Sequence, residues 1–277
     1  MKKISMLLIG VLLISLLFPL FSTVEANATS TIFCPQCGKQ INSDSKFCMF
    51  CGTIIPTIDG SSLQTSPTYN SVREASFNIG DIVIFGEFEQ DNSYYNGKEP
   101  IEWYVIAKED NRVKLLSKYA LDRQPYNTDW VEITWEYSSL REWLNGAFLD
   151  GAFSPSEQRA ILTSQVNADR NPDYRTDPGH GTMDKVFCLS INEFQNIPTK
   201  IKACAGTAFC YAEGARESQN GNCSWWLRTP GWYQKSAADV NNKGIANYDE
   251  NMHKGYNVNH RGHGVRPAVW VDVSMIV

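Results

Sequence analysis

Residues 34–52 read CPQCGKQINSDSKFCMFCG and contain two Cys-x-x-Cys pairs, each followed by glycine, with ten residues between the pairs. A Cys-x-x-Cys turn aims two thiolates at one metal ion, and Gly38 and Gly52 permit the tight turn that follows each pair. Two such turns supply four sulfur ligands in the tetrahedral arrangement that structural Zn²⁺ prefers. The predicted zinc ligands are Cys34, Cys37, Cys48 and Cys51.

Two other interpretations of these four cysteines stay open. An iron tetrathiolate knuckle has similar spacing, and an oxidising compartment favours disulfides over free thiolates. The repeated Cys-x-x-Cys-Gly unit favours zinc over two disulfides, because disulfide frameworks rarely repeat it. The segment resembles the small bacterial zinc-ribbon modules with CPxCG and FCxxCG halves. That resemblance implies a structural zinc ribbon over residues 32–52.

The N-terminus has the pattern of an export signal. Lys2 and Lys3 precede the apolar run SMLLIGVLLISLLFPLF, and Ala26-Asn27-Ala28 is a small-x-small site of the kind that signal peptidase cleaves. The apolar run is also close to the length that spans a bilayer. Residues 1–28 are therefore interpreted as a cleaved signal peptide, with an uncleaved membrane anchor through residues 4–22 as the alternative. Both interpretations place the rest of the chain outside the cytoplasm.

Composition separates a linker from a globular domain. Residues 53–76 are rich in Ser, Thr and Pro, which predicts a flexible linker. Residues 77–277 alternate apolar and polar side chains densely and are long enough for one sizeable domain.

The formal net charge of −5 argues against a nucleic-acid partner, because such a partner requires a basic face. Eight tryptophans in a chain that is 12% aromatic point to a surface that contacts a carbohydrate or a protein.

The domain is expected to combine strands with short helices. β-rich runs predict strands at 82–85, 101–106, 113–116, 224–231, 237–240 and 265–271. Three Ser-x-x-Glu capping boxes, which start at Ser139, Ser154 and Ser190, predict helix N-termini. The adjacent Trp225 and Trp226 are expected to point to opposite faces of their strand, one into the core and the other free to be exposed.

Five stretches occur in order along this domain: FGEFEQD from Phe85, IEWYVI from Ile101, TWEYSSLREWLN from Thr134, WWLRTPG from Trp225 and GVRPAVWV from Gly264. Together they resemble an uncharacterised bacterial domain family that is often joined to zinc ribbons or signal sequences. The closing half is also similar to the end of C-type-lectin-like domains, which include the formylglycine-generating-enzyme type. The resemblance implies an α+β fold, with a twisted antiparallel sheet, a few flanking helices and long loops on one side.

Three charged residues in the last third of the chain are candidates for ligand binding. Arg228 and Arg266 each stand close to a proline near the end of an apolar run. They are interpreted either as cations that line a ligand cleft or as structural clamps, because the fixed guanidinium fork suits loop carbonyls or a carboxylate such as Asp239.

The candidate contact surface consists of Trp232 and Tyr233, which follow the turn after the strand at 224–231. The polar stretch 241–263 is expected on the same side, because loops carry recognition without disturbing the strands beneath them. Two histidines in this stretch, His260 and His263, are interpreted as solvated loop residues or as ligands of a second metal.

A second set of cysteines, Cys188, Cys204, Cys210 and Cys223, has a pairing that the sequence leaves open. Formylglycine-generating enzymes use two cysteines, but these four do not fall in that motif context. The chain has no nucleophile elbow, zinc-protease helix, phosphate loop or dinucleotide fingerprint. The expected function is a non-enzymatic, exported module that binds a glycan or a protein surface of the cell envelope. An enzyme of the formylglycine-generating type, another cell-envelope enzyme and a structural envelope protein are the alternatives.

Overall fold

The computed structural model describes residues 31–33, 39–42, 77–248, 251–252 and 254–275. These residues belong to two compact units, Met1–Asn70 and Ser71–Val277. In the first unit, strands β1 (Thr31–Phe33) and β2 (Gln40–Asn42) pair antiparallel. The predicted zinc ligands, the linker at 53–76 and the export segment at 1–28 lie outside the described residues. Within the described part of the chain, no helix is both long enough and apolar enough to cross a membrane.

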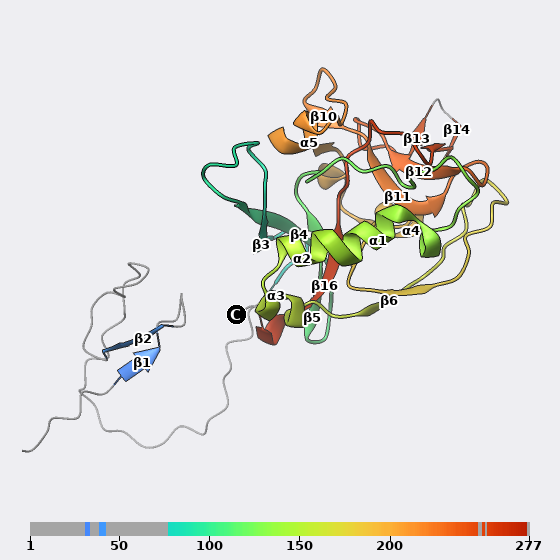
Figure 1. Cartoon of the computed structure of the whole chain (residues 1–277). Coiled ribbons are helices and arrows are strands. Elements are labelled where there is room, and N and C mark those ends of the chain that lie inside the picture. The colour runs from blue at the N-terminus through green and yellow to red at the C-terminus, as the bar shows by residue number, and fades with distance from the viewer. Residues whose placement is uncertain (1–30, 34–38, 43–76, 249–250, 253, 276–277) are drawn as a thin grey trace, which may run out of the picture. The chain divides into compact units, whose positions relative to one another are not determined.

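A five-stranded antiparallel sheet organises the second unit (Figure 1). Its order is β3 (Ile82–Phe88), β4 (Glu99–Glu109), β5 (Arg112–Ser117), β16 (Ala268–Asp272) and β8 (Val186–Phe187). The last strand therefore lies inside the sheet, with Val271 opposite Val113 and Val269 opposite Val186. The strand expected at 265–271 begins only at Ala268, because Pro267 has no N–H to donate to a ladder.

Strand β3 bends where its register with β4 shifts, between Ile84 and Glu87. Gly86 lies in this bulge with φ of +71°, a conformation that side chains disfavour. A Cβ atom on Gly86 would lie 2.6 Å from the Phe153 ring. The bulge thus needs glycine, and it lets the helical layer approach the strand closely.

A continuous helical segment supplies much of the second layer. It consists of α1 (Ser139–Trp143), a π-helical turn (Leu144–Phe148) and α2 (Leu149–Ala152). Its apolar side chains pack inward, since Leu140, Leu144 and Phe148 are buried. The predicted capping residue is wrong by one position. Ser138 Oγ accepts the Arg141 N–H, while the Ser139 hydroxyl accepts the N–H of Thr128.

The other two predicted capping boxes are confirmed. Ser154 and Glu157 cap α3 (Pro155–Ala160), and Ser190 and Glu193 cap α4 (Ile191–Asn196). Thr207 caps α5 (Ala208–Ala212) through the Cys210 N–H. Single 3₁₀ turns occur at Trp135–Tyr137, Thr199–Ile201 and Val273–Met275.

A second, three-stranded antiparallel sheet contains β11 (Trp225–Pro230), β12 (Ser236–Val240) and β15 (Tyr256–Asn257). Figure 1 shows β11 and β12 beside the short pair β13 (Asn247–Tyr248) and β14 (Asn251–Met252). Two more short pairs are β6 (Ser164–Val166) with β7 (Thr182–Asp184), and β9 (Cys204–Ala205) with β10 (Asn222–Cys223).

Strand β11 is covered on both faces, which corrects the expectation for its two tryptophans. Both Trp225 and Trp226 are fully buried. The Trp225 ring packs against Phe194 at 5.8 Å between centroids, and the Trp226 ring stacks on His263 at 4.3 Å. The domain is a mixed α+β structure with antiparallel sheets and few helices, as the sequence predicts at that level.

Candidate functional site

The turn between β11 and β12 carries the two aromatic residues predicted to contact a ligand. Its shape is fixed by Ser236, whose N–H donates to Tyr233 O at 2.9 Å and whose hydroxyl accepts the Tyr233 N–H at 3.1 Å. The Trp232 N–H donates to Lys254 O at 2.9 Å, and the Lys254 ammonium lies 5.2 Å from the Trp232 ring centroid. The turn is thus tied to the segment that precedes β15.

A second exposed tryptophan, Trp130, adjoins the same turn. The Lys235 ammonium lies 4.8 Å from the Trp130 ring centroid. The two loops are joined by Ile133 N–H, which donates to Gln234 O at 3.2 Å, and by the Gln234 side chain, which donates to Ile133 O at 3.3 Å. Sequence reasoning missed Trp130, although a tryptophan in the polar stretch NTDWVE is a signal that could have identified it.

We call Trp130, Trp232 and Tyr233 the aromatic surface. Trp130 is 53% exposed and Trp232 is 48% exposed, while Tyr233 is half-buried and hydrogen-bonds to Asn257 through its hydroxyl. Exposed indole and phenol rings on a hydrogen-bonded turn offer flat apolar faces at a low entropic cost of ordering. Such a surface can stack on sugar rings or anchor a protein side chain.

The polar stretch 241–263 divides between two places. Lys254 and Asn257 contact the aromatic turn, whereas Asn242 O accepts the side-chain amides of Asn220 and Asn222. Only part of the stretch therefore adjoins the aromatic surface.

Asp239, in β12, begins a chain of three side chains in which Asp239 and His263 are buried and His260 is half-buried. Its carboxylate lies 2.8 Å from Nε2 of His263, and Nδ1 of His263 lies 2.8 Å from Nδ1 of His260. The Gly262 N–H also points at His260 Nδ1, so that nitrogen is an acceptor. His263 Nδ1 then donates to that nitrogen, and His263 Nε2 faces the Asp239 carboxylate.

Neighbouring groups hold His260 in the neutral form. Burial, the charge of His263 and the charge of Arg216 together lower the pKa of His260 to about 4. Asp239 is 2% exposed, and its Oδ1 has no hydrogen-bond partner among the described residues. The contact between Asp239 and His263 therefore ties the loop around His263 to β12.

Arg228 clamps three chain segments. Its side chain donates to Asn167 O at 3.1 Å and to Cys188 O at 2.9 Å, and it forms an ion pair with the Glu193 carboxylate. The side chain is only 4% exposed. This geometry is that of a structural clamp, with Glu193 rather than Asp239 as the carboxylate.

Arg266 is fully buried and also binds loop carbonyls. It donates to Ser117 O at 2.8 Å and to Ile201 O at 2.7 Å, and its guanidinium lies 5.0 Å from the Trp225 ring centroid. Within the described part of the chain, its Nη2 atom has no hydrogen-bond partner. Burial lowers the pKa of this arginine. Thus the structure places Arg228, Asp239 and Arg266 in the interior and only Trp232 and Tyr233 at the surface.

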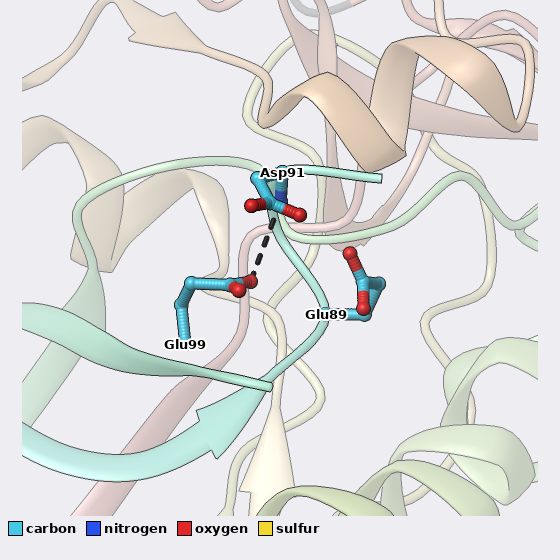
Figure 2. A group of neighbouring side chains, drawn as sticks. All are labelled: Glu89, Asp91 and Glu99. Carbon is cyan, nitrogen blue, oxygen red and sulfur yellow. Dashed lines mark hydrogen bonds between the residues drawn. The ribbon is translucent and has the colours of Figure 1, made fainter. Parts of the chain in front are cut away.

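Three carboxylates gather where β3 ends and β4 begins (Figure 2). Oxygens of Glu89, Asp91 and Glu99 all lie within 4.8 Å of one another, a set that a hard cation such as Ca²⁺ accepts. Each carboxylate also accepts backbone N–H groups of its own loop, for example Ser93 N to Glu89 at 3.0 Å and Gln90 N to Glu99 at 2.7 Å. These bonds explain the cluster as the scaffold of the loop.

Comparison with known protein families finds two matches. The family described as Domain of unknown function (DUF6273) matches residues 110–273, and the zinc-ribbon domain matches residues 33–55. The first match runs from the turn before β5 to the end of β16 and includes the aromatic surface. The second match includes all four predicted ligand cysteines, whose chemistry suits zinc. No curated protein and no solved structure matches the chain.

Proposed function

The chain belongs to the family described as a domain of unknown function (DUF6273), and from that premise we propose that it is an exported, envelope-associated binding module whose aromatic surface recognises a glycan or a protein surface. The observation that carries the proposal is the pair of half-exposed tryptophans, Trp130 and Trp232, on adjoining hydrogen-bonded loops. Exposed tryptophans on a fixed backbone are unusual in a surface that contacts only water, and they are typical of contact sites.

A glycan is the favoured ligand. The three rings, each partly covered, expose well under the roughly 800 Å² per partner that a stable protein complex buries. Sugars need less area, because one indole face covers one pyranose ring. Lys235 lies over one face of the Trp130 ring and Lys254 over one face of the Trp232 ring, where they supply charged donors next to the rings.

The remaining parts of the proposal rest on the sequence. The N-terminal pattern supports export, and the zinc ribbon is proposed as a small structural module held by Zn²⁺. For the main domain we propose a C-type-lectin-like fold. Its support is the closing Gly-Val-Arg-Pro motif at Gly264–Pro267, which leads into a central strand, and the long loops after β12.

A glycan array and a pull-down of envelope material test the proposal. Loss of both tryptophan rings in a Trp130→Ala/Trp232→Ala variant should weaken binding by about 30-fold or more, since contact-site aromatics are each worth about 1–2 kcal/mol. The melting temperature should hardly change, because both rings are half in solvent. Tyr95→Ala is the matched control: its ring is fully exposed on the loop between β3 and β4.

Equal binding by the double variant and the Tyr95 control would refute the aromatic surface as the contact site. Retention that survives protease treatment of the envelope material assigns the ligand to the glycan class. Retention that is lost on that treatment assigns it to a protein.

A further inference from the structure

Three of the four cysteines in the main domain come together from three different elements. Cys204 lies in β9, Cys210 in α5 and Cys223 in β10, and all three are buried free thiols in the described structure. Cys204 and Cys223 are direct partners in the antiparallel register of β9 and β10. Cys223 therefore has two cysteines beside it.

The sulfur atoms of Cys210 and Cys223 lie beside the same glycine, Gly264. A Cβ atom built on Gly264 would lie 3.1 Å from Cys223 Sγ and 3.4 Å from Cys210 Sγ, so both sulfurs border the same point. The Cys210 thiol donates to the carbonyl of Asp122, 3.2 Å away, while its sulfur borders Cys223. Cys204 instead directs its thiol at the carbonyl of Ala205, 3.3 Å away.

The electrostatics of the two sulfurs agree with this contact. The interaction with Cys210 lowers the pKa of Cys223, and burial acts in the opposite direction. The interaction with Cys223, together with burial, raises the pKa of Cys210. Opposite pKa shifts are expected for two thiols that titrate as a coupled pair at short distance.

We propose that Cys210 and Cys223 are a disulfide-forming pair, oxidised when the chain folds in the exported compartment proposed above. The oxidant is a disulfide of another molecule. The Cys223 thiolate attacks one sulfur of that disulfide and releases the other as a thiolate. The Cys210 thiol then loses its proton and attacks Cys223 Sγ, which forms the Cys210–Cys223 bond and releases the second thiolate. The pair loses two electrons and the oxidant gains them. Both sulfurs are enclosed in the folded domain, so the exchange precedes closure.

The bond would link α5 to β10 and close the loop between them. That loop contains Gly214 and Gly221, both at positive φ, which add to the freedom of the unfolded chain. A cross-link over a loop of this size raises the melting temperature of a 200-residue domain by about 5–10 °C. Cys188 is the internal comparison, because its neighbour is Arg228 rather than another cysteine.

A peptide map of the refolded full chain tests the proposal. The reduced chain is refolded with Zn²⁺ in mixed oxidised and reduced glutathione, free thiols are alkylated in denaturant, and the chain is cut with trypsin without reduction. Cleavage after Lys202, Arg216 and Arg228 places Cys204 and Cys210 in one peptide and Cys223 in the next. The expected result is a disulfide between these two peptides, with Cys188 alkylated.

Fragmentation of the linked peptides decides which cysteine is bonded, because cleavage between Cys204 and Cys210 separates the two possibilities. A Cys204→Ser variant should keep the link and a Cys210→Ser variant should lose it. The proposal is overturned if the two peptides are not linked, or if the link runs from Cys204. This refolding needs neither export nor a ligand, so its outcome is independent of the proposed function.

Discussion

Substitution of Glu193 tests how much its ion pairs contribute to the stability of the domain. One carboxylate serves two roles: it completes the capping box of α4 through the Ser190 N–H, and it forms ion pairs with Lys114 and Arg228. Glu193→Gln keeps an acceptor oxygen for the capping box, in which glutamine is a common substitute. The substitution therefore removes the charge with little loss of the cap.

The magnitude follows from the pKa of this carboxyl. Burial raises it, but the charges of Arg228 and Lys114 and the hydrogen bonds from Lys114 and Ser190 outweigh burial and lower the pKa from 4.5 to about 2. A shift of this size corresponds to about 3 kcal/mol of folding free energy at neutral pH. Because the side chain is 24% exposed, solvent screening reduces the expected loss to about 2–3 kcal/mol.

The sign of the pH dependence is fixed by the lowered pKa. The folded state binds the proton less readily than the unfolded state, so the stabilisation is fully present above pH 4.5 and is lost as pH falls toward 2. Urea unfolding at pH 7, 5, 4 and 3 gives the difference in unfolding free energy between wild type and Glu193→Gln. This difference should become smaller at pH 4 and pH 3. Tryptophan fluorescence reports the main domain alone, because all eight tryptophans lie between Trp103 and Trp270.

Glu157→Gln is the matched control. Glu157 occupies the same place in the Ser154 box and accepts the Gly86 N–H at 3.0 Å, but no ion pair involves it among the described residues. Its substitution should cost less than about 1 kcal/mol. The ion-pair reasoning would be refuted if Glu193→Gln lost the same free energy of unfolding at pH 3 as at pH 7. It would also be refuted if that loss were no larger than the loss for Glu157→Gln.

Three other predictions concern the ribbon, the linker and a tight turn. Elemental analysis should find about one zinc per chain, and Cys48→Ser should release it; four oxidised thiols and no metal would contradict the site. Limited proteolysis should cut first within residues 53–76 and leave a stable C-terminal fragment, whereas early cuts elsewhere would show that the linker is misassigned. Gly255→Ala should destabilise the domain by about 3 kcal/mol or more, because Gly255 has φ of +72° and the new Cβ would lie 2.0 Å from Ala237 O. Gly97→Ala, at φ of +88° in open space, should reduce the free energy of unfolding by about 1 kcal/mol. Equal reductions for Gly255→Ala and Gly97→Ala in urea unfolding would contradict the predicted clash.

Features that depend on near neighbours in sequence were predictable. The boxes at Ser154 and Ser190 were identified because the interacting groups are three residues apart. Strands β3, β4 and β5 were found because alternation with a period of two is visible in the sequence. The four ribbon cysteines were assigned from their spacing, and the zinc-ribbon match covers them.

Features that depend on distant partners were not predictable. One of the adjacent tryptophans Trp225 and Trp226 was expected to be free for exposure, because nothing near them in sequence shows that His263 covers the Trp226 face of the strand. The sequence likewise offers no sign that Asp239 pairs with His263 rather than with an arginine. Ser139 was chosen over Ser138 because only Ser139 has a glutamate, Glu142, three residues later. The sequence does not show that the Ser139 hydroxyl accepts the distant N–H of Thr128, which leaves Ser138 as the cap.

The position of β16 has a consequence for when the domain can fold. The strand fills the middle of the sheet, but it is the last strand of the domain to be made. Before β16 is in place, β5 has an unpaired edge and β8 has no partner in this sheet. The strands that are made earlier therefore cannot form the complete core. Pairing between the two ends of the domain is slow, because a long loop must close first. A chain of this topology can complete its central sheet only after its last strand is made, which is compatible with the export that we propose.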